Sequence, residues 1–246
     1  MVIELAIATG LLGATAAGAY FWPHALKPLQ IRRLRAYCRR KRVLVLSYDD
    51  GPGATITPAL LELLAGEKAR ATFFPLGERA AAAPRLLDAV AAEGHEIGCH
   101  SQWHRHPWRT SPHRAIEDIA RGYQALARWL PSDALFRPPC GKLTLLTAWH
   151  VRRRRAPLAW WTIDSGDVHD PLPRPGGALA ALRRDGGGVV LLHDFDRTDA
   201  DADERVKFVL ETTQVLLTEA ARAGLNVRRL GEVLGDLASV NPNGHA

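Results

Sequence analysis

Cysteine is scarce in this 246-residue chain: there are three, at positions 38, 99 and 140, and none forms a CxxC pair. An odd number of widely spaced cysteines argues against a full disulfide framework and against a zinc ribbon. Glycine and proline, with 21 and 16 residues, are too few for a collagen-like or wholly disordered chain. The apolar fraction of 47% is ordinary for a globular protein, so we expect one sizeable folded domain.

Acidic residues are almost absent from the first 48 positions, which hold eight Lys or Arg residues against the single Glu4. The rest of the chain contains 24 basic and 25 acidic residues, so the formal net charge of +6 comes mainly from residues 27–42. A nearly neutral body gives no sign of a surface for nucleic acid. We therefore expect no nucleic-acid partner.

Residues 2–22 carry Glu4 as their only charge, and 21 residues in a helix would just cross a bilayer. This favours a transmembrane or signal-anchor helix at residues 1–22, followed by a basic linker at residues 23–42. The basic residues on its carboxyl side predict, by the positive-inside rule, a catalytic domain that faces the cytoplasm. Two alternatives stay open: a cleaved signal with export of the domain, and a buried helix of the domain.

From residue 42 onward, short β-rich runs alternate with longer helical patterns. This alternation predicts a parallel sheet, and closure of the sheet into a barrel would place functional side chains at the carboxyl ends of the strands. The expected strands are residues 43–48, 71–76, 95–99, 134–136, 158–163, 188–192 and 225–228.

Two adjacent carboxylates follow the first expected strand, where DDGPG occupies residues 49–53. Neighbouring strand residues point to opposite faces, so the side chains of Asp49 and Asp50 diverge. One can bind a metal ion while the other faces a reacting water, a division that suits metal-assisted hydrolysis. Alone, the motif also fits a polar turn.

A histidine pair follows the third expected strand, in HSQWH at residues 100–104. His100 and His104 could meet one ion if this segment makes a helical turn. With Asp50 they would form an Asp-His-His site with open positions for water and substrate, as a catalytic metal needs. His106 could replace His104 by sequence alone, but the four-residue spacing favours His104.

Three further strand ends carry polar motifs: RPPCG at residues 137–141, DSGD at residues 164–167 and HD at residues 193–194. With the first two motifs, the chain resembles the NodB-type polysaccharide deacetylases, carbohydrate esterase family four. Their motifs read roughly TFDDGP, HSxxH, RxPxG, DxxDW and LLH, and all five have counterparts here in the same order. The resemblance covers roughly residues 43–234.

The resemblance implies a distorted (β/α)7-type barrel at residues 43–235. The sequence after it, at residues 236–246, is typical of a flexible tail. The resemblance also implies that Asp50, His100 and His104 bind a divalent metal ion. Zinc suits these ligands, and cobalt, manganese or nickel are compatible with them.

The remaining motifs supply the acid–base groups of such a hydrolase. By resemblance, Asp49 is the general base and His193 the general acid. Arg137 would act on Asp49 and Asp167 on His193 by orienting each group and stabilising its charge. The backbone N–H of Cys140 would be a second donor to the oxyanion, beside the metal.

Three positions depart from the family pattern. Val168 stands where the fourth motif usually has Trp, Cys140 where the third often has an aromatic residue, and Tyr48 where the first usually has Phe. These changes alter the expected groove wall rather than the metal or acid–base groups. The identity of the sugar therefore does not carry over from the family.

The expectation is a membrane-anchored, metal-dependent hydrolase that removes N-acetyl groups from an amino sugar in a polysaccharide, an oligosaccharide or a lipid-linked sugar. One alternative is hydrolysis of another non-peptide C–N amide bond. Another is a non-catalytic glycan-binding or assembly protein on the same fold. Binding alone would need neither Asp49 nor His193, so their presence favours the enzyme.

Overall fold

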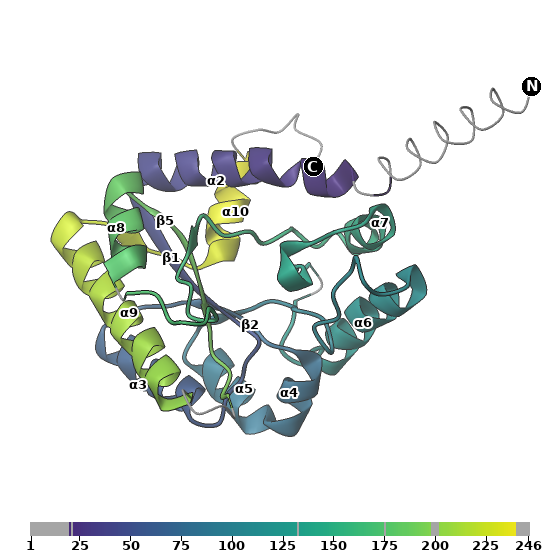
Figure 1. The fold of residues 1–246 in the computed structure, drawn as a ribbon, viewed down its shortest axis with the longest axis horizontal. Helices are drawn as coiled ribbons and strands as arrows, with labels where there is room; N and C mark the ends of the chain where they lie inside the picture. Colours follow the sequence, from purple (N-terminus) through teal and green to yellow (C-terminus); the bar gives the residue numbers. More distant parts are fainter. Residues whose placement is uncertain (1–19, 21, 132, 175, 198–201, 240–246) are drawn as a thin grey trace, which may run out of the picture.

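The computed structural model describes residues 20, 22–131, 133–174, 176–197 and 202–239. Parallel strands run through the centre of the molecule and helices surround them (Figure 1). This confirms the α/β class that the alternating sequence pattern predicts. The strands are β1 (Val43–Asp49), β2 (Thr72–Phe74), β3 (Glu96–Ile97), β4 (Ile163–Asp164), β5 (Gly188–His193) and β6 (Asn226–Val227).

The helices cover the outside of the strands. They are α2 (Lys27–Lys41), α3 (Ile56–Gly66), α4 (Gly77–Ala82), α5 (Pro84–Ala92), α6 (Pro112–Ala125), α7 (Leu145–Arg153), α8 (Gly176–Asp185), α9 (Ala202–Ala223) and α10 (Leu230–Ser239). In Figure 1, α2 crosses the top, α8 and α9 lie on the left, α6 and α7 on the right, and α3 to α5 below.

Strand β1 is the centre of the sheet. It pairs in parallel with β5 along one edge, and with β2 and β6 at opposite ends of the other edge. All seven of its residues are buried. A parallel strand covered on both faces needs apolar side chains throughout, which explains the run VLVLSY before the first carboxylate.

The sheet closes into an irregular barrel through a narrow junction. Cys99, just after β3, bridges in parallel to Phe136, which in turn bridges to Leu158. The N–H of Arg137 donates to the carbonyl of Cys99 at 3.0 Å, and the N–H of Ala159 donates to the carbonyl of Phe136 at 2.9 Å. The chain then runs into β4, which pairs with β5. The expected strands at residues 134–136 and 158–163 thus contribute mainly the single bridges at Phe136 and Leu158.

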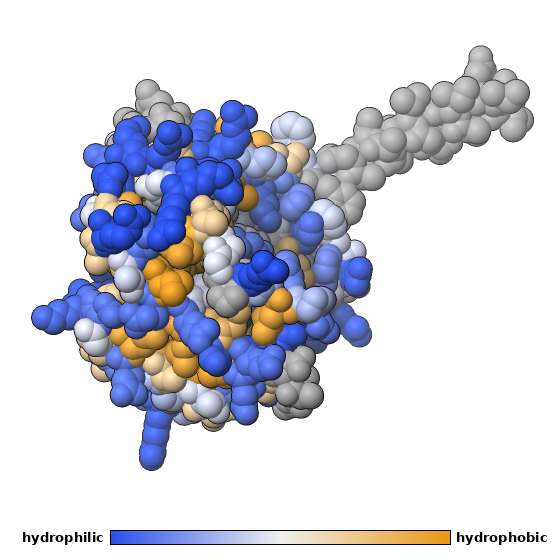
Figure 2. All heavy atoms as spheres, turned by 60° about the vertical axis from the view of Figure 1, so that its left-hand side comes forward, coloured by the Kyte–Doolittle hydropathy of each residue, from blue (hydrophilic) through white to orange (hydrophobic). Residues whose placement is uncertain are grey.

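The segment at residues 23–42 is helical along most of its length, where a basic linker was expected. Leu34, Tyr37 and Cys38 of α2 are buried against the sheet, while the basic residues stand mainly on its outer side. Figure 2 shows hydrophilic side chains gathered at the top of the molecule, the height at which α2 lies in Figure 1. Apolar residues three and four positions apart form a buried stripe, which the high charge of the segment obscured.

Most of the membrane helix expected at residues 1–22 lies outside the described residues, which include only Tyr20 and Trp22 of that range. Of the helices that the structure describes, none combines the length and apolarity needed to cross a bilayer. At the other end, α10 continues to Ser239 where a flexible tail was expected, and residues 240–246 are not described.

Candidate active site

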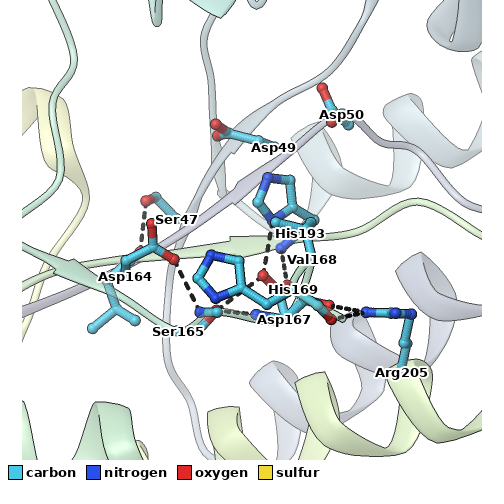
Figure 3. Close-up of polar contacts among 12 residues, drawn as sticks. Ser47, Asp49, Asp50, Asp164, Ser165, Asp167, Val168, His169, His193 and Arg205 are labelled. Atoms are coloured by element: carbon cyan, nitrogen blue, oxygen red, sulfur yellow. Dashed lines mark hydrogen bonds and ion pairs between the residues drawn. The ribbon is translucent and has the colours of Figure 1, made fainter. Parts of the chain in front are cut away.

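Asp49 is the last residue of β1, and Asp50 begins the loop that follows. Asp50 adopts a left-handed backbone conformation with φ of 68°, which is uncommon for a residue other than glycine. Its N–H donates to the carbonyl of Phe74 at 3.1 Å, and Arg79 Nη1 donates to its carbonyl at 2.6 Å. This turn directs the two carboxylates to separate positions (Figure 3).

His100 and His104 come together, but not through the helical turn that their spacing suggested. The segment between them is not helical, and Ser101 and His104 have left-handed φ values of 73° and 55°. The two ring centroids lie 4.9 Å apart. The predicted helical turn is therefore wrong, because an irregular loop rather than a helix brings the two rings together.

The ligand atoms of Asp50, His100 and His104 all lie within 4.8 Å of one another. The Nε2 atoms of His100 and His104 are 3.5 and 3.8 Å from Asp50 Oδ1. His106 is not in this group, and its Nδ1 accepts a hydrogen bond from the N–H of Trp108 at 3.2 Å. The geometry thus selects His104 over His106.

The chemistry of these three residues fits a divalent cation. Burial lowers the pKa of His100 to about 3, so its imidazole is neutral. Its Nδ1 lies 2.7 Å from the carbonyl of Arg137, which fixes the proton there and leaves the Nε2 lone pair facing Asp50. Asp50 Oδ1 is buried and accepts no hydrogen bond from the described residues. A lone pair and a carboxylate oxygen that face each other without a proton are the donors a zinc ion needs.

Asp49 is held by a buried guanidinium. Arg137 Nη1 donates to Asp49 Oδ1 at 2.6 Å and to Ser47 Oγ at 2.9 Å, and Arg137 is fully buried. Burial raises the pKa of the Asp49 carboxyl, and the positive charge of Arg137 opposes that effect. The other oxygen, Oδ2, lies 3.6 Å from His100 Nε2. One oxygen is therefore fixed by Arg137, while the other faces the three-residue cluster.

His193 ends β5 and is held by Asp167 (Figure 3). The ring atom Nδ1 lies 2.9 Å from Asp167 Oδ1, and the backbone N–H of His193 donates to Asp167 Oδ2 at 2.7 Å. Burial lowers the pKa of His193, but the nearby carboxylates, Asp167 first among them, raise it more, to about 9. The imidazole is thus protonated near neutral pH and keeps its Nε2–H for a further partner.

Cys140 lies in the short 3-10 turn η1 (Pro139–Gly141) that follows Arg137. Its φ of 54° turns the backbone out of the regular helical path. Among the described residues, none accepts a hydrogen bond from the Cys140 N–H. A donor without a protein partner is available to an oxyanion, whereas the thiol itself needs no role in this arrangement.

Asp118 is a residue that the sequence analysis missed. It belongs to α6, is 1% exposed, and its carboxylate accepts from the N–H groups of Gln102, Trp103 and Arg105 at 2.7 to 3.2 Å. These bonds hold the irregular loop that carries His104. The signal in the sequence is an Asp on the buried face of an amphipathic helix, where an acidic residue is rare unless paired.

Asp118→Ala is expected to weaken zinc binding by about 10- to 100-fold, the usual cost of removing a group that supports a metal ligand. Calorimetric titration of zinc into the variant measures this directly. Glu211→Ala is the control, because Glu211 is half exposed and pairs with Lys207 on the same helix, α9. Unchanged zinc affinity in a folded Asp118→Ala protein would show that the loop does not depend on this carboxylate.

Two more buried groups support the loops of the site. Asp194 Oδ2 accepts from Thr57 Oγ1 at 2.8 Å and lies so close to Gly51 that a Cβ there would be 2.2 Å away. Arg205 of α9 donates to the carbonyls of Asp167 and His169 at 3.0 and 2.8 Å (Figure 3). Each loop of the site is therefore tied to a residue on another element.

The family model for polysaccharide deacetylases matches residues 36–154. A peptidoglycan-N-acetylglucosamine deacetylase of Bacillus cereus is 36% identical over 158 residues, which are 63% of this chain and 73% of that protein. The chain belongs to the polysaccharide deacetylase family. This confirms the family expected from the motifs, and with it a hydrolase of the polysaccharide N-deacetylase class.

Other comparisons extend the likeness over more of this polysaccharide deacetylase. The peptidoglycan-N-acetylglucosamine deacetylase PgdA of Listeria monocytogenes is 26% identical over 229 residues, 91% of this chain but only 44% of that protein. The solved Bc1960 peptidoglycan N-acetylglucosamine deacetylase superposes with a TM-score of 0.69 at 22% identity, covering 79% of this chain and 89% of that one. That structural likeness shows the shared fold.

Proposed function

We propose that this protein is a metal-dependent hydrolase that removes N-acetyl groups from an amino sugar. The observation that supports this most strongly is the position of Asp49. Its free oxygen faces the Asp50–His100–His104 cluster while Arg137 holds the other oxygen. That arrangement places a base directly beside the residues of the proposed metal site.

Asp50, His100 and His104 would hold the metal, with zinc the best match to two imidazoles and a carboxylate. When bound, the ion supplies Lewis acidity toward the acetyl carbonyl and the attacking water. Asp49 Oδ2 then accepts the proton of that water as its oxygen bonds to the carbonyl carbon. The Cys140 N–H donates to the resulting oxyanion.

The second half of the reaction breaks the C–N bond. An amine is a poor leaving group unless it is protonated, so an acid must supply a proton as the bond opens. His193 carries that proton on Nε2, and Asp167 stabilises the imidazolium from the other nitrogen. The products are acetate and a free amino sugar.

The substrate we propose is an N-acetylated glycan or a lipid-linked sugar. The relatives named above support an N-acetylated amino sugar, and Val168 in place of the usual Trp leaves the choice of polymer open. A membrane location through residues 1–22, with the domain on the cytoplasmic side, is part of the proposal and rests on the sequence pattern alone.

Acetate release tests the proposal. The zinc-loaded protein should liberate acetate from one or more members of a panel of acetylated chitooligosaccharides, peptidoglycan fragments and lipid-linked N-acetyl sugars. Release of another acid from a non-acetyl amide would favour the alternative C–N hydrolase. Binding of a glycan without any hydrolysis would favour the non-catalytic alternative.

The pH dependence of kcat/KM is expected to report the proton on His193. The acid works while protonated, so activity is lost as pH rises through its pKa, which the carboxylates raise to about 9. Asp167→Asn removes the negative charge that raises the His193 pKa most, so the alkaline limb of the profile should move to lower pH. Asp164→Asn, three residues earlier at the end of β4, is the control and should leave the limb in place. A lower kcat with an unmoved limb would make Asp167 merely structural.

A further inference from the structure

Exposed apolar side chains are concentrated in one part of the molecule. Of the eight large apolar residues that are most exposed among those described, seven belong to three segments near the start of α2, at residue 108 and along α7. The exception, Val215, lies on α9. The seven are Trp22, Leu26, Leu29, Trp108, Leu145, Leu146 and Trp149, with exposed fractions of 39% to 62%.

The three segments meet at Trp108. Its ring packs edge-on against His24 with centroids 4.9 Å apart, and its Nε1 donates to the carbonyl of Leu143 at 2.9 Å. Lys142 Nζ lies 4.5 Å from the same ring. Trp108 therefore joins the chain that enters α2 to the chain that enters α7. We call the exposed surface of these segments the apolar-basic face.

The charge of this face is of one sign. Residues 20–42, 104–116 and 138–163 contain 16 of the chain's 32 Lys and Arg residues and none of its 26 acidic residues. Arg152 and Arg153 are exposed one turn after Trp149, and Arg32 and Arg33 are exposed just after Leu29. On both helices, exposed basic side chains thus follow the exposed apolar ones.

We propose that the apolar-basic face rests on the surface of a bilayer that contains anionic lipids. Tryptophan and leucine bury their apolar parts at the headgroup level, while Lys and Arg attract anionic headgroups. A protein partner would require acidic groups spread over the same area, whereas an anionic bilayer supplies them everywhere. The apolar run at residues 2–22 ends at this face, because Trp22 is one of its members.

The face also adjoins the candidate active site. Lys27 Nζ donates to the carbonyl of Gly141 at 3.1 Å, next to the Cys140 N–H, and lies 4.7 Å from the ring of Trp161. A bilayer that contacts the first turn of α2 and α7 would therefore lie beside the edge of the site. This placement suits a glycan attached to a lipid, but the docking itself does not depend on the proposed hydrolysis.

Hydrogen exchange on the full chain tests the docking separately from any anchoring or activity. The protein is placed in nanodiscs of phosphatidylcholine alone or of phosphatidylcholine mixed with phosphatidylglycerol. In the anionic discs, amides of α7 and of the first turn of α2 should exchange roughly tenfold more slowly than in the neutral discs. Amides of α3, which lies away from the face, should exchange equally in both.

Two variants make the test specific. Leu146→Ser with Trp149→Ser removes two exposed side chains and should abolish the difference between the discs, while Val215→Ser, the exposed apolar residue outside the face, should preserve it. Equal exchange of α7 in the two kinds of disc overturns the proposal. Protection that needs no lipid and grows with protein concentration also overturns it, because the occupant would then be a second copy of the chain.

Discussion

Asp49→Asn is expected to lower kcat for acetate release by roughly a hundredfold to ten-thousandfold, the scale of a lost general base. The amide has nearly the same shape as the carboxylate but cannot accept the proton of the attacking water. Kinetics of acetate release on an active member of the glycan panel, together with metal analysis of the same preparation, checks this. Bound zinc should stay near the wild-type level, because Asp49 is not one of the three proposed ligands.

Asp88→Asn is the matched control for this variant. Asp88 also pairs with an arginine, Arg128, but at the surface of the molecule. Surface ion pairs contribute little, so the control should keep its activity and its stability. Turnover of Asp49→Asn close to the wild-type rate would remove Asp49 from the role of base and leave the proposed mechanism without one.

His104→Ala is expected to reduce zinc affinity by roughly a hundredfold or more. Loss of a residue that only orients a ligand costs about 10- to 100-fold, and loss of the ligand itself should cost at least as much. Removing one of three protein ligands leaves an incomplete coordination shell. Competition with a chelating dye gives the affinity without relying on activity. His106→Ala, two residues further along, should leave zinc affinity unchanged, because His106 instead accepts from the N–H of Trp108.

The opposite pattern would contradict the ligand assignment: zinc lost in His106→Ala and retained in His104→Ala. Thermal unfolding of both variants, with and without zinc, provides an independent readout. A ligand that binds only the folded state raises the midpoint temperature of unfolding. Zinc should therefore raise the midpoint of wild type and of His106→Ala more than that of His104→Ala.

The site motifs could be predicted from the sequence because each lies where a strand ends. Asp49 and His193 end neighbouring strands, and the parallel register pairs them directly. The alternation of strands and helices predicts that these residues lie at the same edge of a parallel sheet, but not that β1 lies next to β5. The backbone shape of the loops could not be predicted in the same way. The segment with left-handed turns at Ser101 and His104 is held by N–H groups that donate to Asp118, which lies on another element.

Supporting groups were missed for a similar reason. Asp118 and Arg205 lie on α6 and α9, and Asp194 was noted only as part of the HD motif after β5. Nothing near these residues in the chain shows which loop they bind. Their only local signal is a charged residue at a buried position. The helical state of residues 27–41 was missed because the charges obscured the apolar stripe that packs on the sheet.

The narrow junction that closes the barrel has a consequence for how activity fails on heating. On the far side, β1 and β5 are paired over six residues, but the junction is held by isolated bridges at Cys99 and Phe136. The residues that follow these two are His100 and Arg137. Regions with fewer contacts open at lower free energy than the paired centre. Local fraying of this seam would displace the proposed metal ligand His100 and the guanidinium that holds the proposed base, while the rest of the sheet stays folded. We therefore expect activity to be lost at a lower temperature than global unfolding.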